Sequence, residues 1–158
     1  MRLFVAVYPP DEVRRHLRSR LDTAVAGRRV RLTRIEKWHI TLAFLGEVPV
    51  LDGLVEALET VTVPRGLPLR LRGGGGFGGR VTWVGVEGEL NELARDVRTA
   101  FKVGDPRPFH PHLTIMYAHD RAVREALDGY AGPPWTLDEI ALVQSLPDGT
   151  YEVRFSRR

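Results

Sequence analysis

The chain has 158 residues, 43% of them hydrophobic, and it contains no cysteine. This length and composition suit one globular domain, and the absence of cysteine excludes disulfides, thiolate nucleophiles and cysteine-based zinc sites. The net charge is +3 with a strong excess of arginine over lysine, which is compatible with an anionic ligand and equally with a general compositional bias towards arginine.

The N-terminal part predicts a buried strand followed by an amphipathic helix. Residues 3–8 are apolar and stop at Pro9-Pro10, which is too short a run for a secretory leader or a membrane span. A helix is expected to continue to about Ala26, because apolar residues recur at four-residue intervals at Val13, Leu17, Leu21 and Val25. We therefore expect a soluble, cytoplasmic protein.

The rest of the chain predicts an alternation of strands and helices. Strands are expected over 29–33, 38–45, 67–71, 81–86, 111–117, 137–145 and 150–155, and helices over 51–61, 90–101 and 122–127. The glycine-rich run 73–79 has the spacing of a nucleotide-binding loop, but a strand follows it and the P-loop lysine is absent. A flexible hairpin at the rim of a cleft is therefore expected there. Helical crossovers mixed with hairpins favour an α+β fold.

One predicted strand, Trp38 to Leu45, has a polar face that is unusual for a buried strand. Strand alternation places Ile40, Leu42 and Phe44 towards the core and His39, Thr41 and Ala43 on the opposite face. The second strand, 111–117, repeats this pattern, with its core face at Leu113, Ile115 and Tyr117 and its polar face at His112 and Thr114. Two strands from opposite halves of the chain thus present the same His-x-Thr pair.

The repeated pair indicates acid–base chemistry on a phosphodiester. Imidazoles titrate near neutral pH, so two of them in one cleft can act as general base and general acid. The hydroxyl groups of Thr41 and Thr114 can hold non-bridging phosphate oxygens between the two rings. Neither a metal nor any other cofactor is required, and no acidic ligand stands at a familiar metal spacing, although His39, His110, His112 and His119 could in principle bind zinc.

Beyond this chemistry, the sequence resembles the RNA 2′,3′-cyclic phosphodiesterases, also called 2′-5′ RNA ligases, of the two-histidine phosphoesterase superfamily. The resemblance extends over nearly the whole chain and is carried by Arg2–Val7, Trp38–Gly46, Val81–Val86, Phe109–Ile115 and the residues around Ser145 and Gly149–Glu152.

The resemblance implies a duplicated α+β fold, with two pseudo-symmetric lobes of antiparallel-rich sheet and outer helices around a central cleft, within one domain, 1–158. It implies metal-independent hydrolysis of a 2′,3′-cyclic phosphate, on RNA or on a nucleoside, to the 2′-phosphate by a monomer without a membrane partner. His39 and His112 correspond to the catalytic residues, and Thr41 and Thr114 to the phosphate-binding ones. By analogy His112 activates water as the base and His39 protonates the 3′-oxygen as the acid.

Some alternatives stay open from the sequence. The same histidine pair could catalyse the reverse reaction, 2′-5′ ligation of RNA, or the chain could be a non-catalytic module that binds RNA or nucleotide phosphates. Many relatives of the family have an arginine where this chain has Tyr117. Strand alternation places the Tyr117 side chain on the face opposite His112, outside the predicted site. Arg80, Arg107 or Arg121 could then supply the missing positive charge. For Phe77, base stacking and a loop anchor are both compatible with the sequence, whereas core packing is expected for Trp38.

Overall fold

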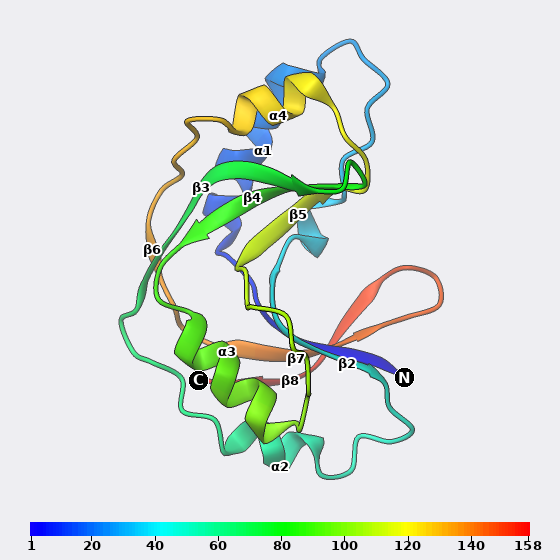
Figure 1. Cartoon of the computed structure of the whole chain (residues 1–158), viewed down its shortest axis with the longest axis vertical. Coiled ribbons are helices and arrows are strands. Elements are labelled where there is room, and N and C mark those ends of the chain that lie inside the picture. The colour runs from blue at the N-terminus through cyan, green and yellow to red at the C-terminus, as the bar shows by residue number, and fades with distance from the viewer.

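The computed structural model describes residues 1–158 and contains four α-helices around a curved antiparallel sheet of eight strands (Figure 1). The strands are β1 (Arg2–Val7), β2 (Ile40–Glu47), β3 (Pro68–Phe77), β4 (Val81–Glu87), β5 (His112–Met116), β6 (Trp135–Thr136), β7 (Ile140–Ser145) and β8 (Tyr151–Arg157). The α-helices are α1 (Asp11–Val25), α2 (Leu54–Glu59), α3 (Asn91–Ala100) and α4 (Arg121–Leu127), and a 3₁₀ turn, η1, spans Ile35–Lys37. None of the helices combines the length and the apolar character that crossing a bilayer demands.

The sheet consists of two half-sheets that meet at a single residue pair. Its strand order is β6-β3-β4-β5-β2-β1-β7-β8, so one half-sheet holds β3 to β6 and the other holds β1, β2, β7 and β8. The half-sheets meet between β2 and β5, where Ile40 pairs with Leu113. This arrangement confirms the predicted α+β fold with an antiparallel-rich sheet.

Two helices cross from one half-sheet to the other: each follows a strand of one half-sheet but packs on the side of the other. Helix α1 follows β1 but packs against α4, which lies on β3, and α3 follows β4 but packs against β2. Figure 1 shows α1 and α4 together at one end of the molecule and α2 and α3 together at the other. The predicted apolar stripe of α1 drives this packing, because Val13, Leu17 and Leu21 are all fully buried. The crossing helices tie the two half-sheets into one unit.

Strand β1 is buried on both faces, which explains its unbroken apolar sequence. Leu3, Val5 and Val7 belong to the main core. Phe4 and Ala6 lie on the other face in a smaller cluster with residues of β7. Through Phe4, this second cluster also packs against His39.

Strand β2 departs from regular alternation, and the predictions for Ala43 and Phe44 were therefore wrong. Its pairing with β1 shifts register twice, between Thr41 and Ala43 and between Phe44 and Gly46. Each shift inserts one extra residue and reverses the side-chain facing beyond it. Ile40, Leu42 and Ala43 are consequently buried, whereas Phe44 is 66% exposed.

The glycine-rich run belongs to a hairpin, as predicted, but most of its glycines lie within strand β3 and not in the turn. Gly75 pairs with Trp83 and Gly76 with Thr82 of β4, and the turn itself falls at Gly78-Gly79. A Cβ atom at Gly75 would lie 2.3 Å from the Trp83 indole. Glycine is required here because the ring packs directly on the strand backbone.

Residues 29–33 are not a strand. This segment follows α1 and contacts the sheet through Thr33, whose amide donates to the Ile115 carbonyl at 2.8 Å. The hydroxyl group of Thr33 donates a 2.9 Å hydrogen bond to the same carbonyl and accepts a 2.6 Å hydrogen bond from the indole N–H of Trp38. Trp38 is buried, as predicted. The short strand β6 was not predicted.

Replacing Gly75 with alanine tests the close packing of Trp83 on β3. We expect Gly75→Ala to lower the free energy of unfolding by roughly 1–3 kcal/mol, because the added methyl group must displace the indole. Gly104→Ala is the matched control, since its Cβ would meet no atom within 4 Å. Urea unfolding of both variants provides the measurement. Equal stability of Gly75→Ala and the wild type would contradict the close contact.

Candidate active site

The two His-x-Thr pairs flank the junction between the half-sheets. Ile40 and Leu113 are paired and fully buried. Extending this antiparallel register by one residue on each side places Thr41 across from His112 and His39 across from Thr114. Since successive side chains alternate, these four residues lie on the face opposite the core. The two pairs are therefore related by a local two-fold arrangement.

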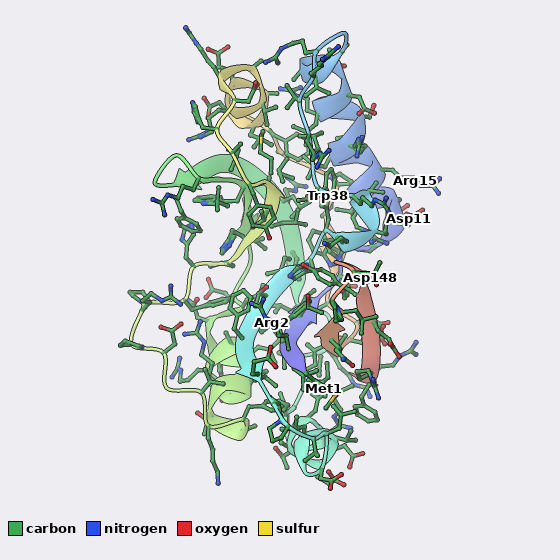
Figure 2. The ribbon with its side chains drawn as sticks, turned by 90° about the vertical axis from the view of Figure 1, so that its right-hand side faces the viewer. Met1, Arg2, Asp11, Arg15, Trp38 and Asp148 are labelled. Carbon is green, nitrogen blue, oxygen red and sulfur yellow. The ribbon has the colours of Figure 1, made fainter.

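One cavity of about 440 Å³ brings the four predicted residues together, since His39, Thr41, His112 and Thr114 all line it. Sequence reasoning missed most of its other walls, which come from β1, η1, β2 and the β7–β8 hairpin. Figure 2 shows Arg2 at the N-terminal strand beside β2, on the side of the molecule that it presents to the viewer. The additional lining residues are Arg2, Leu3, Phe4, Thr33, Lys37, Phe44, Gly46, Tyr117, Ser145 and Tyr151.

The backbone fixes the tautomer of His39. Its Nδ1 lies 2.7 Å from the carbonyl oxygen of Lys37, which can only accept, so Nδ1 carries the proton of the neutral ring. Nε2 then accepts a 3.0 Å hydrogen bond from the hydroxyl group of Thr41. Nε2 of His39 is thereby held beside the hydroxyl group of Thr41, as the spacing of the two residues predicted.

Aromatic rings pack around His39, and its burial favours the neutral form of the imidazole. Phe4 stacks on the imidazole with 4.7 Å between ring centroids, and Tyr151 meets it edge-on at 5.5 Å. Burial lowers the pKa of His39 to about 4, with the Lys37 carbonyl opposing that shift and His112 adding to it. In the free protein His39 is neutral at pH 7. For Phe4, the sequence indicated only a place in the apolar run of the first strand and did not indicate its contact with His39.

His112 has the same backbone anchor in a more open setting. Its Nδ1 lies 2.7 Å from the carbonyl oxygen of His110, so the neutral ring again presents an unprotonated Nε2. Burial lowers the pKa of His112, and the His110 carbonyl opposes this shift. Both histidines are thus presented as neutral rings with a basic Nε2.

A second aromatic group supports His112 from the side of the glycine-rich strand. Phe77 meets the His112 ring edge-on at 5.1 Å, and Trp83 lies 4.7 Å from the His110 ring. Phe77 contacts Trp83 at 5.5 Å and remains 44% exposed. Phe77 therefore packs beside the second histidine.

The structure corrects the prediction for Tyr117. Strand β5 ends at Met116, so alternation no longer governs the next residue. Tyr117 is 70% exposed and lines the cavity. The predicted core face of this strand holds only for Leu113 and Ile115, which are fully buried.

The positive charges of the cavity come from residues other than those expected. Arg107 pairs with Asp105 and Arg121 with Glu125, and neither they nor Arg80 line the cavity. Arg2 and Lys37 line it instead. The ammonium group of Lys37 lies 4.5 Å from the centre of the Tyr151 ring, which positions it by a cation–π contact. Arg2 and Lys37 are therefore the arginine and lysine side chains that line this cavity.

The chain matches the 2′-5′ RNA ligase superfamily over residues 9–149 and belongs to that family. The RNA 2′,3′-cyclic phosphodiesterase of Archaeoglobus fulgidus is 38% identical over 126 residues, which cover 73% of this chain and 71% of that protein. The protein of the same name from Escherichia coli is 34% identical over 134 residues, covering 77% and 74%. The RNA 2′,3′-cyclic phosphodiesterase of Geobacillus stearothermophilus is 46% identical over 93 residues, which cover 51% of this chain and only 30% of that protein.

Solved structures share the fold over the full chain. TT0787 of Thermus thermophilus matches with a TM-score of 0.82 at 29% identity, covering 99% of this chain and 96% of that one. E. coli LigT complexed with phosphate matches with a TM-score of 0.72 at 25% identity, covering 99% and 95%. LigT complexed with ATP gives a TM-score of 0.72 at 26% identity, covering 99% and 96%.

The buried, neutral His39 predicts an acid-sensitive contribution to stability. Between its ordinary pKa of 6.5 and its folded pKa of about 4, the unfolded chain binds a proton that the folded chain does not. Stability is therefore lost as pH falls through this window, by about 3 kcal/mol. His39→Gln lacks this linkage, so its free energy of unfolding should fall less than that of the wild type between pH 7 and pH 4.

The control is His119→Gln, which removes an exposed histidine but keeps His39, so the loss of stability due to His39 at acid pH should remain. Urea unfolding at several pH values measures all three proteins. Parallel profiles for His39→Gln and the wild type would contradict the depressed pKa.

Proposed function

We propose that this chain is an RNA 2′,3′-cyclic phosphodiesterase that hydrolyses the cyclic phosphate of RNA ends or nucleosides to the 2′-phosphate without a metal. The observation that carries the proposal is the β2–β5 register, which sets two His-x-Thr pairs around one cavity. The names of the Archaeoglobus and E. coli relatives support the same reaction.

The two sides of the cavity suit the two ends of an in-line displacement. A cyclic phosphodiester between the histidines has the attacking water on one side and the departing 3′-oxygen on the other. One neutral Nε2 takes a proton from the water, and the other imidazole, protonated, gives a proton to the 3′-oxygen. The hydroxyl groups of Thr41 and Thr114 donate to the non-bridging oxygens, and Arg2 and Lys37 offset their charge.

The burial of His39 supports the acid role for this residue once an anion is bound. In the free protein its ring is neutral, but a phosphate anion in this poorly solvated position offsets the cost of charging the ring. His39 therefore takes up a proton as the substrate binds. His112, in the more open setting, remains neutral and activates water as the base.

Removing either histidine separates catalysis from binding. We expect His39→Ala and His112→Ala each to lower kcat by about 10²–10⁴-fold on nucleoside 2′,3′-cyclic phosphates. Thr41→Val and Thr114→Val should each cost about a hundredfold, since one donor to the phosphate is lost. The assay is run in EDTA, with the 2′- and 3′-phosphate products resolved by chromatography.

His119→Ala is the control in this assay and should keep wild-type activity. Unchanged turnover in the His39 and His112 variants would contradict the two-histidine mechanism. Loss of wild-type turnover in EDTA, restored by a divalent cation, would contradict metal independence.

A sulfur substitution at the leaving group tests the division of roles. In a substrate with sulfur in place of the bridging 3′-oxygen, the leaving thiolate needs no proton from an acid. The defect of His39→Ala relative to the wild type should therefore shrink by at least about tenfold on this substrate, whereas that of His112→Ala should persist. Rescue of His112→Ala in place of His39→Ala would reverse the assignment.

A further inference from the structure

A second, larger groove continues from the catalytic cavity. It has a volume of about 830 Å³ and is lined by the segment 29–37, by residues that follow β5 and by the β7–β8 turn. It shares Thr33, Lys37, Tyr117 and Tyr151 with the catalytic cavity. In Figure 2, Asp148 of the β7–β8 turn lies next to the segment that leads to Trp38. A ligand anchored at the histidines can therefore extend into this groove without leaving the surface.

The groove carries three exposed arginines that form no ion pair. Arg29, Arg31 and Arg34 line it, and none of them lies within salt-bridge distance of a carboxylate, unlike the neighbouring Arg28, which pairs with Asp120. Unpaired arginines are available to bind phosphate through their planar guanidinium groups.

The carboxylates of the groove offset these arginines only in part. Asp120 is held by Arg28, and the side chain of Asp148 accepts bonds from the amide and hydroxyl groups of Thr150 at 2.9 and 2.6 Å. Glu36 and Asp148 are the carboxylates of the groove without a cationic partner, and they face four cations, Arg29, Arg31, Arg34 and Lys37. The charge left over is positive and faces the groove.

The arginines are displayed from a backbone that is fixed at both ends. Arg28 is tied to Asp120 ahead of α4, and Thr33 is bonded to the Ile115 carbonyl of β5. Val30 and Leu32 pack against the main core between these ties. An extended segment held in this way presents its cations without the ordering cost of a free loop.

We infer that this groove binds the single-stranded RNA that precedes the cyclic phosphate, with its phosphates on Arg29, Arg31 and Arg34. The inference rests on the proposed function: a 2′,3′-cyclic phosphate ends a chain, so the polymer continues from its 5′ side and needs a path away from the histidines. The exposed ring of Tyr117, at the junction of groove and cavity, provides a stacking surface for a base there.

The test compares substrates of different length on matched charge variants. The groove variant is Arg29→Gln/Arg31→Gln/Arg34→Gln, and the control variant is Arg65→Gln/Arg95→Gln/Lys102→Gln, which removes three exposed cations elsewhere that also form no ion pair. Arg95 and Lys102 line a separate basic cavity beside α3, so the control also examines the competing path. Each protein is assayed on a nucleoside 2′,3′-cyclic phosphate and on a five-nucleotide RNA with the same end.

We expect the wild type to have a kcat/KM at least about tenfold higher on the oligonucleotide at low salt. The groove variant should lose this advantage, and its slope of log(kcat/KM) against log[salt] should be smaller by about 2. Its activity on the nucleoside substrate should be unchanged, and the control variant should behave as the wild type on both.

Three results would overturn the inference: no oligonucleotide advantage in the wild type, equal losses in both variants, or a loss confined to the control variant. Binding of a fluorescent five-nucleotide RNA with a 2′-phosphate end, measured by anisotropy, tests the groove independently of turnover. If neither substrate is hydrolysed, the proposed function fails, while weaker binding to the groove variant alone still supports the groove.

Discussion

The pairing of Ile40 with Leu113 is the contact on which the site depends. It joins the half-sheets between β2 and β5 and sets the register that brings two residues from each side onto the same face. A slip of one residue on either strand would turn its histidine and threonine towards the core. Because α1 and α3 each cross to the other half-sheet, the packing of these helices also opposes such a slip.

The site combines this rigid register with an unfavourable setting for charge. Phe4 and Tyr151 pack on His39, and burial also raises the pKa of the nearby Tyr8 to about 12. In such surroundings an imidazolium is costly until an anion arrives, whereas hydrogen bonds to a bound phosphate gain strength. In the proposed reaction, the packing that destabilises a charged His39 in the free protein therefore couples its protonation to the binding of the anion.

The sequence predicted the residues whose role follows from strict periodicity. The stripe of α1, the core face formed by Leu113 and Ile115, and the shared face of the two His-x-Thr pairs all depend only on regular helix or strand geometry. Either copy of the His-x-Thr pattern alone would be a weak signal. Its occurrence in two strands from opposite halves of the chain indicated one common site.

The errors fall where regular geometry ends. Phe44 lies beyond a register shift in β2, and Tyr117 follows the last residue of β5, so alternation misplaced both. The pattern of glycines predicts the β3–β4 hairpin but not its extended strand, because the indole that packs on Gly75 comes from the next strand. Arg2 and Lys37 were missed as cavity cations because their position depends on how distant elements meet, which no local pattern records.

Long-range ¹H–¹⁵N NMR of the histidine ring nitrogens, during titration with a nucleoside 2′-phosphate, tests the paired site most directly. Without ligand, His39 and His112 should both be neutral and protonated at Nδ1 at pH 7. Both rings should then respond together at one equivalent of ligand, with His39 becoming protonated. A response of only one of these rings, or separate responses at different ligand ratios, would contradict a single phosphate site between the two histidines.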